Sequence, residues 1–153
     1  MQSIAKAAGV GQGTLYRHFP TREALLLEVY QDDFARLVEA APALLRAHPQ
    51  EPAQALRAWL DELAVFGRKK HALADVLDAA TRDALHNQQY DQIIAAIASL
   101  LDTGKQAGQL RPDIRPDEVL PLVSFLWHLD TSRDARIPHL LDLVVDGLTG
   151  RRE

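Results

Sequence analysis

The stretch SIAKAAGVGQGTLYRHFPTREALLLEVY, residues 3–30, decides the fold of this chain. The apolar residues before Gly9 follow helical spacing, and Gly9 then ends the first helix because glycine adopts the left-handed conformation at little cost. A second helix is expected at about 12–18, and Pro20 stops it. Thr21 is suited to cap a third, longer helix. The stretch therefore predicts two short helices joined by a glycine turn, followed by a long helix.

Two short helices that cross at a glycine turn are the layout of a helix-turn-helix DNA reader. The outer face of the second helix carries hydroxyl, amide and basic side chains, which suit contacts with phosphates and base edges. A further cation stands at the start of the next helix. The expected DNA-binding residues are Gln12, Thr14, Tyr16, Arg17, His18 and Arg22. A chance helical hairpin in an all-α protein is the alternative interpretation.

The ungapped block AGVGQGTLYRHFPTREAL, residues 8–25, closely resembles the N-terminal domain of TetR-family transcriptional repressors. This resemblance implies that the helix at about 12–18 enters the major groove of DNA. It also implies phosphate contacts by Thr14, Tyr16, His18 and Arg22. Most members of the family have lysine where this chain has Arg22, so the charge is kept while a planar fork replaces a point charge.

The rest of the chain shows helical periodicity throughout, with further helices expected at about 52–69, 72–85, 89–107, 116–129 and 136–148. The sequence thus predicts an all-α fold. A helix-turn-helix DNA-binding domain over 1–30, lacking its first helix, would precede a helical effector-binding and dimerisation domain over 31–153. The stretch LLDTGKQAGQLRPDIRPDEVLPLV is similar to the C-terminal domain of SbtR-like regulators. That resemblance implies an effector cavity and a homodimer built from the last two helices.

An apolar stripe in the middle of the chain either lines a ligand pocket or forms plain core, and family resemblance favours the existence of a pocket without identifying its walls. The pocket candidates are Trp59, Leu63, Phe66, Val76, Leu77, Ile93, Ile97 and Leu100. The basic run over 68–71 could meet an anionic effector. A solvated helix end that suits the helix dipole is the simpler interpretation of that run.

The last two helices carry wide apolar faces for the end of a small chain. An interface of four helices between two identical subunits is the natural interpretation, and burial within one subunit is the alternative. The interface candidates are Leu122, Val123, Leu126, Leu140, Leu141, Val144, Val145 and Leu148.

The composition of the chain limits the classes of function that it can have. The chain has 153 residues, a formal net charge of −4 and no cysteine, so DNA binding must come from a local patch and no thiolate metal site exists. The six histidines lack metal-ligand spacing, and no catalytic or cofactor-binding motif is evident, so neither an enzyme nor a cofactor is expected. No apolar run has the length of a membrane span and no signal peptide is evident, which favours the cytoplasm.

The family domain has a first helix that packs on the other two, whereas this chain begins inside the second helix. We therefore expect apolar faces of Ile4, Ala8, Leu15 and Phe19 to be exposed, and operator binding by this chain to be weak, through truncation or a misassigned start. The favoured function is a dimeric repressor that a small-molecule effector releases from double-stranded operator DNA. The alternative is a ligand-binding and dimerisation module without DNA-binding activity.

Overall fold

The computed structural model describes residues 1–124, 127 and 131–149. Over these residues the secondary structure is helical apart from an isolated antiparallel bridge between Leu110 and Thr149, which confirms the all-α prediction. The α-helices are α1 (Gln2–Ala8), α2 (Gln12–His18), α3 (Arg22–Ala47), α4 (Pro52–Ala74), α5 (Ala79–Gln106), α6 (Pro116–Ser124) and α7 (Ile137–Leu148). A 3-10 helix, η2 (Thr131–Arg136), leads directly into α7.

The turn between α1 and α2 is set by local chemistry. Gly9 has a φ of 68°, in the left-handed region that glycine tolerates best, and its N–H donates back to the carbonyl of Lys6. Gly11 is the N-cap of α2. The Thr21 side chain accepts a hydrogen bond from the Ala24 backbone N–H at 3.1 Å, capping α3. These features confirm the predicted helix-turn-helix layout.

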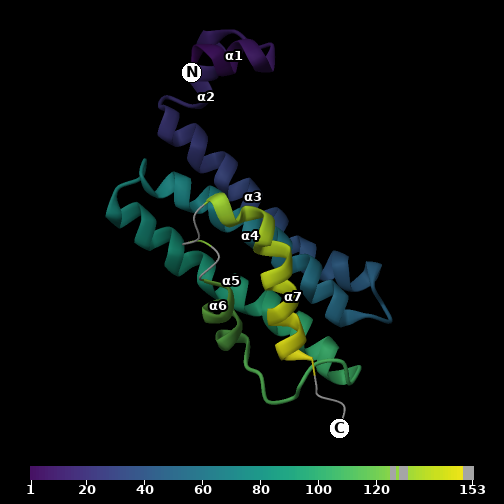
Figure 1. The fold of residues 1–153 in the computed structure, drawn as a ribbon. Helices are drawn as coiled ribbons and strands as arrows, with labels where there is room; N and C mark the ends of the chain where they lie inside the picture. Colours follow the sequence, from purple (N-terminus) through teal and green to yellow (C-terminus); the bar gives the residue numbers. More distant parts are fainter. Residues whose placement is uncertain (125–126, 128–130, 150–153) are drawn as a thin grey trace.

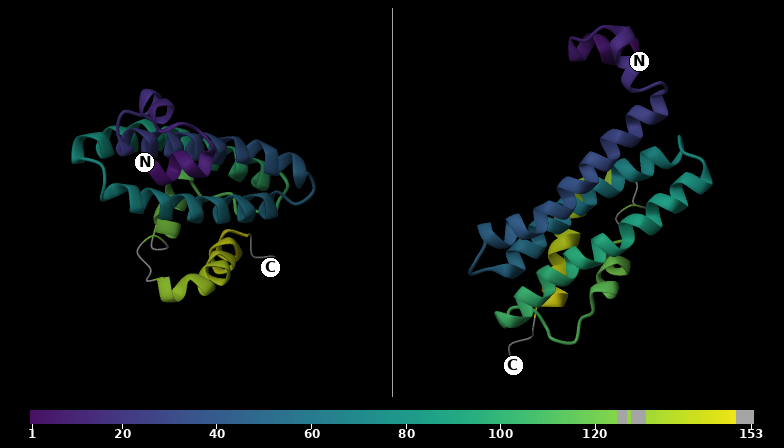
Figure 2. Two further views of the ribbon diagram at one scale, coloured as in Figure 1. Left: turned by 90° about the horizontal axis from the view of Figure 1, so that it is seen from above. Right: turned by 180° about the vertical axis from the view of Figure 1, so that it is seen from behind.

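Helices α1 and α2 lie at one end of the molecule, beyond the start of α3 and away from the helical body (Figure 1). Helix α3 continues without a break from this end into the body, where it packs against α4 and α5. The expected domain boundary at residue 30 therefore falls inside a continuous helix. Seen from above and from behind, α3, α4 and α5 run side by side, with α6 and α7 against them (Figure 2).

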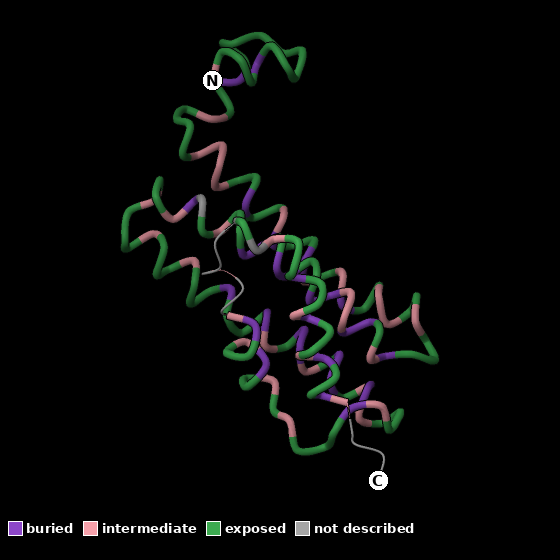
Figure 3. Tube along the Cα trace, viewed as in Figure 1, coloured by how far each residue is buried: buried purple, intermediate pink, exposed green. Residues whose placement is uncertain are grey.

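The core lies where α3, α4, α5, α6 and α7 meet, and buried positions are concentrated there (Figure 3). Trp59 has no exposed surface, and its indole N–H donates to the carbonyl of Leu37 at 2.9 Å, which ties α4 to α3. The largest fully buried side chains are Trp59, Leu56, Leu60, Ile97, Leu100, Leu101, Leu141, Leu148, Val119, Val123 and Pro52.

The helix boundaries in the middle of the chain differ from the prediction. Helix α4 continues to Ala74, and the break follows at 75–78, where the Asp78 carboxylate accepts from the Thr81 N–H at 2.8 Å and starts α5. The polar stretch HNQQ, expected to separate two helices, lies inside α5. Gln89 in that stretch is buried and hydrogen-bonded to another helix, so its polarity does not mark a loop.

The helix expected at 116–129 begins at Pro116 as predicted, and α6 is described as far as Ser124. Its expected end at 129, like the interface candidate Leu126, lies outside the described residues. Over the described part of the chain, none of the helices has the length and apolarity to cross a membrane. Within the same residues, no three His, Asp or Glu side chains gather in an arrangement that could hold a metal ion.

Candidate nucleic-acid interface and ligand cavity

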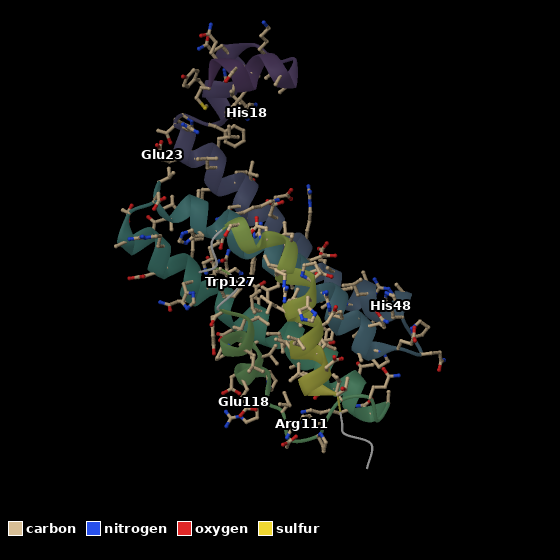
Figure 4. The ribbon with its side chains drawn as sticks, viewed as in Figure 1. His18, Glu23, His48, Arg111, Glu118 and Trp127 are labelled. Carbon is tan, nitrogen blue, oxygen red and sulfur yellow. The ribbon has the colours of Figure 1, made fainter. Side chains whose placement is uncertain are left out.

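The outer face of α2 is open to solvent. The residues predicted to contact DNA on this helix are all exposed, Tyr16 by 43%, whereas Leu15 turns inward and is only 8% exposed. Arg22, the first residue of α3, is exposed beside them. Figure 4 places His18 at this end of the molecule, distant from the body. All six predicted residues are therefore exposed on α2 and at the start of α3: Gln12, Thr14, Tyr16, Arg17, His18 and Arg22.

The cations of this end are unengaged. Among the described residues, Lys6, Arg17 and Arg22 have no ion-pair partner, whereas arginines of the body such as Arg57 and Arg68 are paired with aspartates at 2.6 Å. Unpaired, solvated cations can neutralise phosphates without first breaking an internal ion pair. Despite the net negative charge of the chain, this end therefore offers a local site for a polyanion.

A small apolar contact holds α1 against α2. Ala5 and Leu15 are the buried residues of these helices. Ile4 is 37% exposed, and Ala8 is also exposed. The expectation that Leu15 would be exposed was wrong, because it packs into the hairpin itself, and Phe19 is half-buried.

A cavity of about 570 Å³ lies in the body, among α3, α4, α5 and α6. Its walls are Phe34, Leu63, Phe66, Gly67, Lys70, His71, Ala74, His86, Gln89, Tyr90, Ile93, Asp117, Leu120, Pro121, Ser124 and Trp127. Figure 4 shows Trp127 within this part of the body. A shallower hollow of about 320 Å³ between α3 and α4 includes the charged residues Asp33 and Lys69, which pair with each other at 2.8 Å.

The predicted pocket residues divide into wall and core. Leu63, Phe66 and Ile93 line the cavity. The prediction was wrong for Trp59, Ile97 and Leu100, which have no exposed surface and lie in the core behind the cavity. It was also wrong for Val76, which is 40% exposed, and for Leu77, which packs at the edge of the core, because both follow the end of α4.

The polar part of the cavity wall contains side chains that were not among the pocket candidates, although the basic run over 68–71 was given as a possible contact for an anionic effector. The basic run over 68–71 splits: Arg68 pairs with Asp134 at 2.6 Å and Lys69 pairs with Asp33 at 2.8 Å, while Lys70 faces the cavity. Burial lowers the pKa of the Lys70 ammonium. The signal available in the sequence was spacing, because Lys70 lies one helical turn after Phe66 on the same face of α4.

Gln89 connects the cavity wall to α3. The Tyr30 hydroxyl donates to the Gln89 side-chain oxygen at 2.6 Å in the interior. Burial raises the pKa of Tyr30 to about 12, so this hydroxyl stays protonated, and remains a donor, to a higher pH than an exposed tyrosine. The Tyr30 ring stacks on Phe66, with ring centroids 5.0 Å apart. This contact joins α3, α4 and α5 around the cavity.

The expected dimer face is only partly available to a partner. Val123, Leu141, Val145 and Leu148 are at most 8% exposed and belong to the core of the single chain, so their assignment to an interface was wrong. The other candidates that the structure describes lie on the outside: Leu122 is 43% exposed, and Leu140 and Val144 are half-buried. Leu143 on α7, which the prediction omitted, is 54% exposed.

Family models match both parts of the chain. Residues 1–29 match the model of bacterial regulatory proteins of the tetR family. Residues 51–150 match the C-terminal domain of SbtR-like transcriptional regulators. None of the curated proteins compared with the chain matches it.

Solved structures show the same fold. The TetR transcriptional regulator SCO0520 from Streptomyces coelicolor is 36% identical, with a TM-score of 0.84 over 98% of this chain and 87% of that chain. A TetR transcription regulatory protein from Mycobacterium vanbaalenii is 28% identical, with a TM-score of 0.73 over 97% of this chain and 81% of that one. The reduced form of NemR from E. coli, at 17% identity and a TM-score of 0.71 over 98% and 86% of the two chains, shows the shared fold alone.

Proposed function

The chain belongs to the TetR family of transcriptional regulators, and from this premise we propose that it is a dimeric, cytoplasmic repressor that a small-molecule effector releases from operator DNA. The observation that carries the proposal is the outer face of α2. It carries hydroxyl, amide and unpaired basic side chains, which are all exposed, on a helix that lies away from the body. A helix with such a face fits the major groove of double-stranded DNA.

The residues of this face have separate chemical roles in the proposal. Thr14, Tyr16, His18 and Arg22 contact phosphates and position the helix, which gives affinity without sequence information. Gln12 can bond to a base edge in a bidentate manner, as its side chain carries both a donor and an acceptor. Arg17 supplies a further cation to the backbone or to a guanine edge.

A dimer would set the distance between its two α2 helices, one from each subunit. Leu122 and Leu143 expose apolar surface that a second copy could cover, with Leu140 and Val144 at its margin. A twofold pair of α2 helices matches half-sites about 34–36 Å apart, one turn of DNA. Any change in the relative tilt of the two subunits alters that distance.

Helix α3 connects the cavity wall to α2, the helix that we propose contacts DNA. Phe34 lines the cavity, and Arg22 lies at the start of the same unbroken helix, about 18 Å away at 1.5 Å per residue. A ligand that shifts α3 at Phe34 would also move α2. A ligand that binds only to the shifted arrangement favours that arrangement, and this is sufficient to favour release from DNA.

The test is selection from a random double-stranded DNA library with the full chain, followed by measurement of affinity against salt. We expect enrichment of a site with two related halves and a steep loss of affinity as salt rises. Arg17→Ala and Arg22→Ala should each lower the slope of log affinity against log salt, by about 1 where a phosphate contact is lost. Arg36→Ala is the matched control, because Arg36 is exposed on α3 but pairs with Asp32 at 2.6 Å within the body.

The alternative function is a ligand-binding and dimerisation module without DNA-binding activity. Absence of any enriched sequence, or equal salt slopes for Arg22→Ala and Arg36→Ala, would refute the role of the α2 face and leave this alternative. Sedimentation measures dimer formation independently of DNA. Leu143→Glu should shift the chain toward monomer, since it places a charge on the exposed apolar face of α7.

A further inference from the structure

We propose that the cavity in the body binds an aromatic carboxylate, with the carboxylate at Lys70 and Gln89 and the ring against the aromatic wall. The binding chemistry stands on the cavity alone. Only the role of this ligand as an effector rests on the proposed function.

The polar wall is rich in donors that lack acceptors. The Lys70 ammonium has His86 Nδ1, at 3.3 Å, as its only polar partner among the described residues, and no carboxylate there pairs with it. The Gln89 side chain is 6% exposed, and its oxygen is already occupied by the Tyr30 hydroxyl. Its amide nitrogen donates no hydrogen bond within the part of the chain that the structure describes. A ligand that supplies acceptor oxygens satisfies these groups.

The acidic side chain of the cavity wall is already neutralised. Asp117 receives hydrogen bonds from both Nε and a terminal nitrogen of Arg115, at 3.0 and 2.8 Å. This bidentate pair keeps Asp117 from acting as the counter-ion of Lys70. Because Lys70 lacks a carboxylate partner while Asp117 is paired, the described surface of the cavity favours an anion over a cation.

The apolar wall favours a flat aromatic ring. Phe34, Phe66, Tyr90 and Trp127 line the cavity. Gly67 allows the close approach of the Trp127 indole, because a Cβ at position 67 would lie 1.7 Å from its Nε1. A volume of about 570 Å³ is within the range of small-molecule sites, about 300–1,000 Å³. The cavity thus combines space for a ring with aromatic surfaces that it can stack on.

A single negative charge fits better than two. Lys70 is the lysine of the cavity wall, and the surrounding surface is largely apolar, so a dianion such as a phosphate monoester would be left partly uncompensated. Burial lowers the pKa of Lys70, and a bound carboxylate would favour the charged ammonium by adding a counter-ion.

The experiment is isothermal titration of the full chain, without DNA, with matched pairs of probes. Each acid is compared with its neutral amide: cinnamate with cinnamamide, 2-naphthoate with 2-naphthamide, and indole-3-acetate with indole-3-acetamide. Phenyl phosphate serves as the dianionic probe. We expect at least one acid to bind at least tenfold more tightly than its amide, and phenyl phosphate to bind more weakly than that acid.

Two lysine variants test whether the Lys70 ammonium is the group that binds the carboxylate. Lys70→Met keeps the aliphatic stem but removes the ammonium, and it should abolish the difference between acid and amide while leaving amide binding unchanged. Lys69→Met is the matched control, since Lys69 is adjacent in α4 but pairs with Asp33 outside the cavity. It should retain the preference for the acid, and thermal melts of both variants verify that they are folded.

Several results would overturn the proposal. Equal affinity for acids and amides, no saturable binding by any acid, tighter binding of phenyl phosphate, or an equal loss in Lys69→Met would each do so. An acid that binds as expected without weakening a selected DNA complex would retain the site and refute only its role in release. Failure of DNA selection with intact acid binding would likewise separate the two proposals.

Discussion

Gly104→Ala should destabilise the protein even though alanine is the better helix former. Gly104 is buried in the last turn of α5, and a Cβ there would lie 2.3 Å from Leu110 Cδ1 and 2.6 Å from its Cγ. Leu110 is 4% exposed, and its N–H donates to the Gly104 carbonyl at 3.1 Å. The surrounding core and this backbone hydrogen bond therefore both hold the leucine close to Gly104. The substitution must therefore displace a packed side chain.

The magnitude follows from two opposing terms. Displacing a buried leucine costs about 1.5–3 kcal/mol, while replacing glycine by alanine within a helix gains up to about 1 kcal/mol. With the full helix gain subtracted, the net loss is about 0.5–2 kcal/mol, or a fall in Tm of roughly 1–8 °C for a chain of this size.

Thermal and urea unfolding at matched protein concentration measure this loss. Gly147→Ala is the control, because Gly147 lies in α7 with nothing within 4 Å of its added Cβ, and it should be neutral or slightly stabilising. A Gly104→Ala variant as stable as the wild type would refute the packing argument, as would equal losses in both variants.

Two further substitutions test the capping and the buried contact beside the cavity. Thr21→Ala removes the acceptor for the Ala24 N–H and should cost about 0.5–2 kcal/mol in urea unfolding, with Thr21→Ser restoring most of it; equal stability of all three proteins would contradict the cap. Tyr30→Phe leaves the Gln89 oxygen buried without its donor, which should cost about 1–3 kcal/mol. Because the folded pKa of Tyr30, about 12, exceeds its unfolded value of 10.0, its contribution is complete below pH 10 and is lost as the pH rises through 12. An ultraviolet titration should show a phenol ionisation near pH 12 in the wild type that is lost in Tyr30→Phe.

The reader end of the molecule was predictable because its determinants are contiguous in the sequence. Gly9 supplies the left-handed residue of the turn, Thr21 supplies a side-chain cap, and Leu15 alternates with polar residues at helical spacing. Each of these residues acts within one or two helical turns. The residues that define the motif in the sequence therefore also determine which side of α2 faces solvent.

The sequence by itself determined the helical class, the turn, the Thr21 cap and the set of residues on α2, because these depend on neighbouring residues. Only the tertiary structure decided which of two adjacent lysines faces the cavity, since Asp33 on α3 engages Lys69 while the packing of α4 and α5 turns Lys70 inward. It also placed Leu141 in the core and left Leu143 exposed on the same helix. The spacing of apolar residues identifies a helix face that must be buried, but which element buries that face depends on helices distant in the sequence.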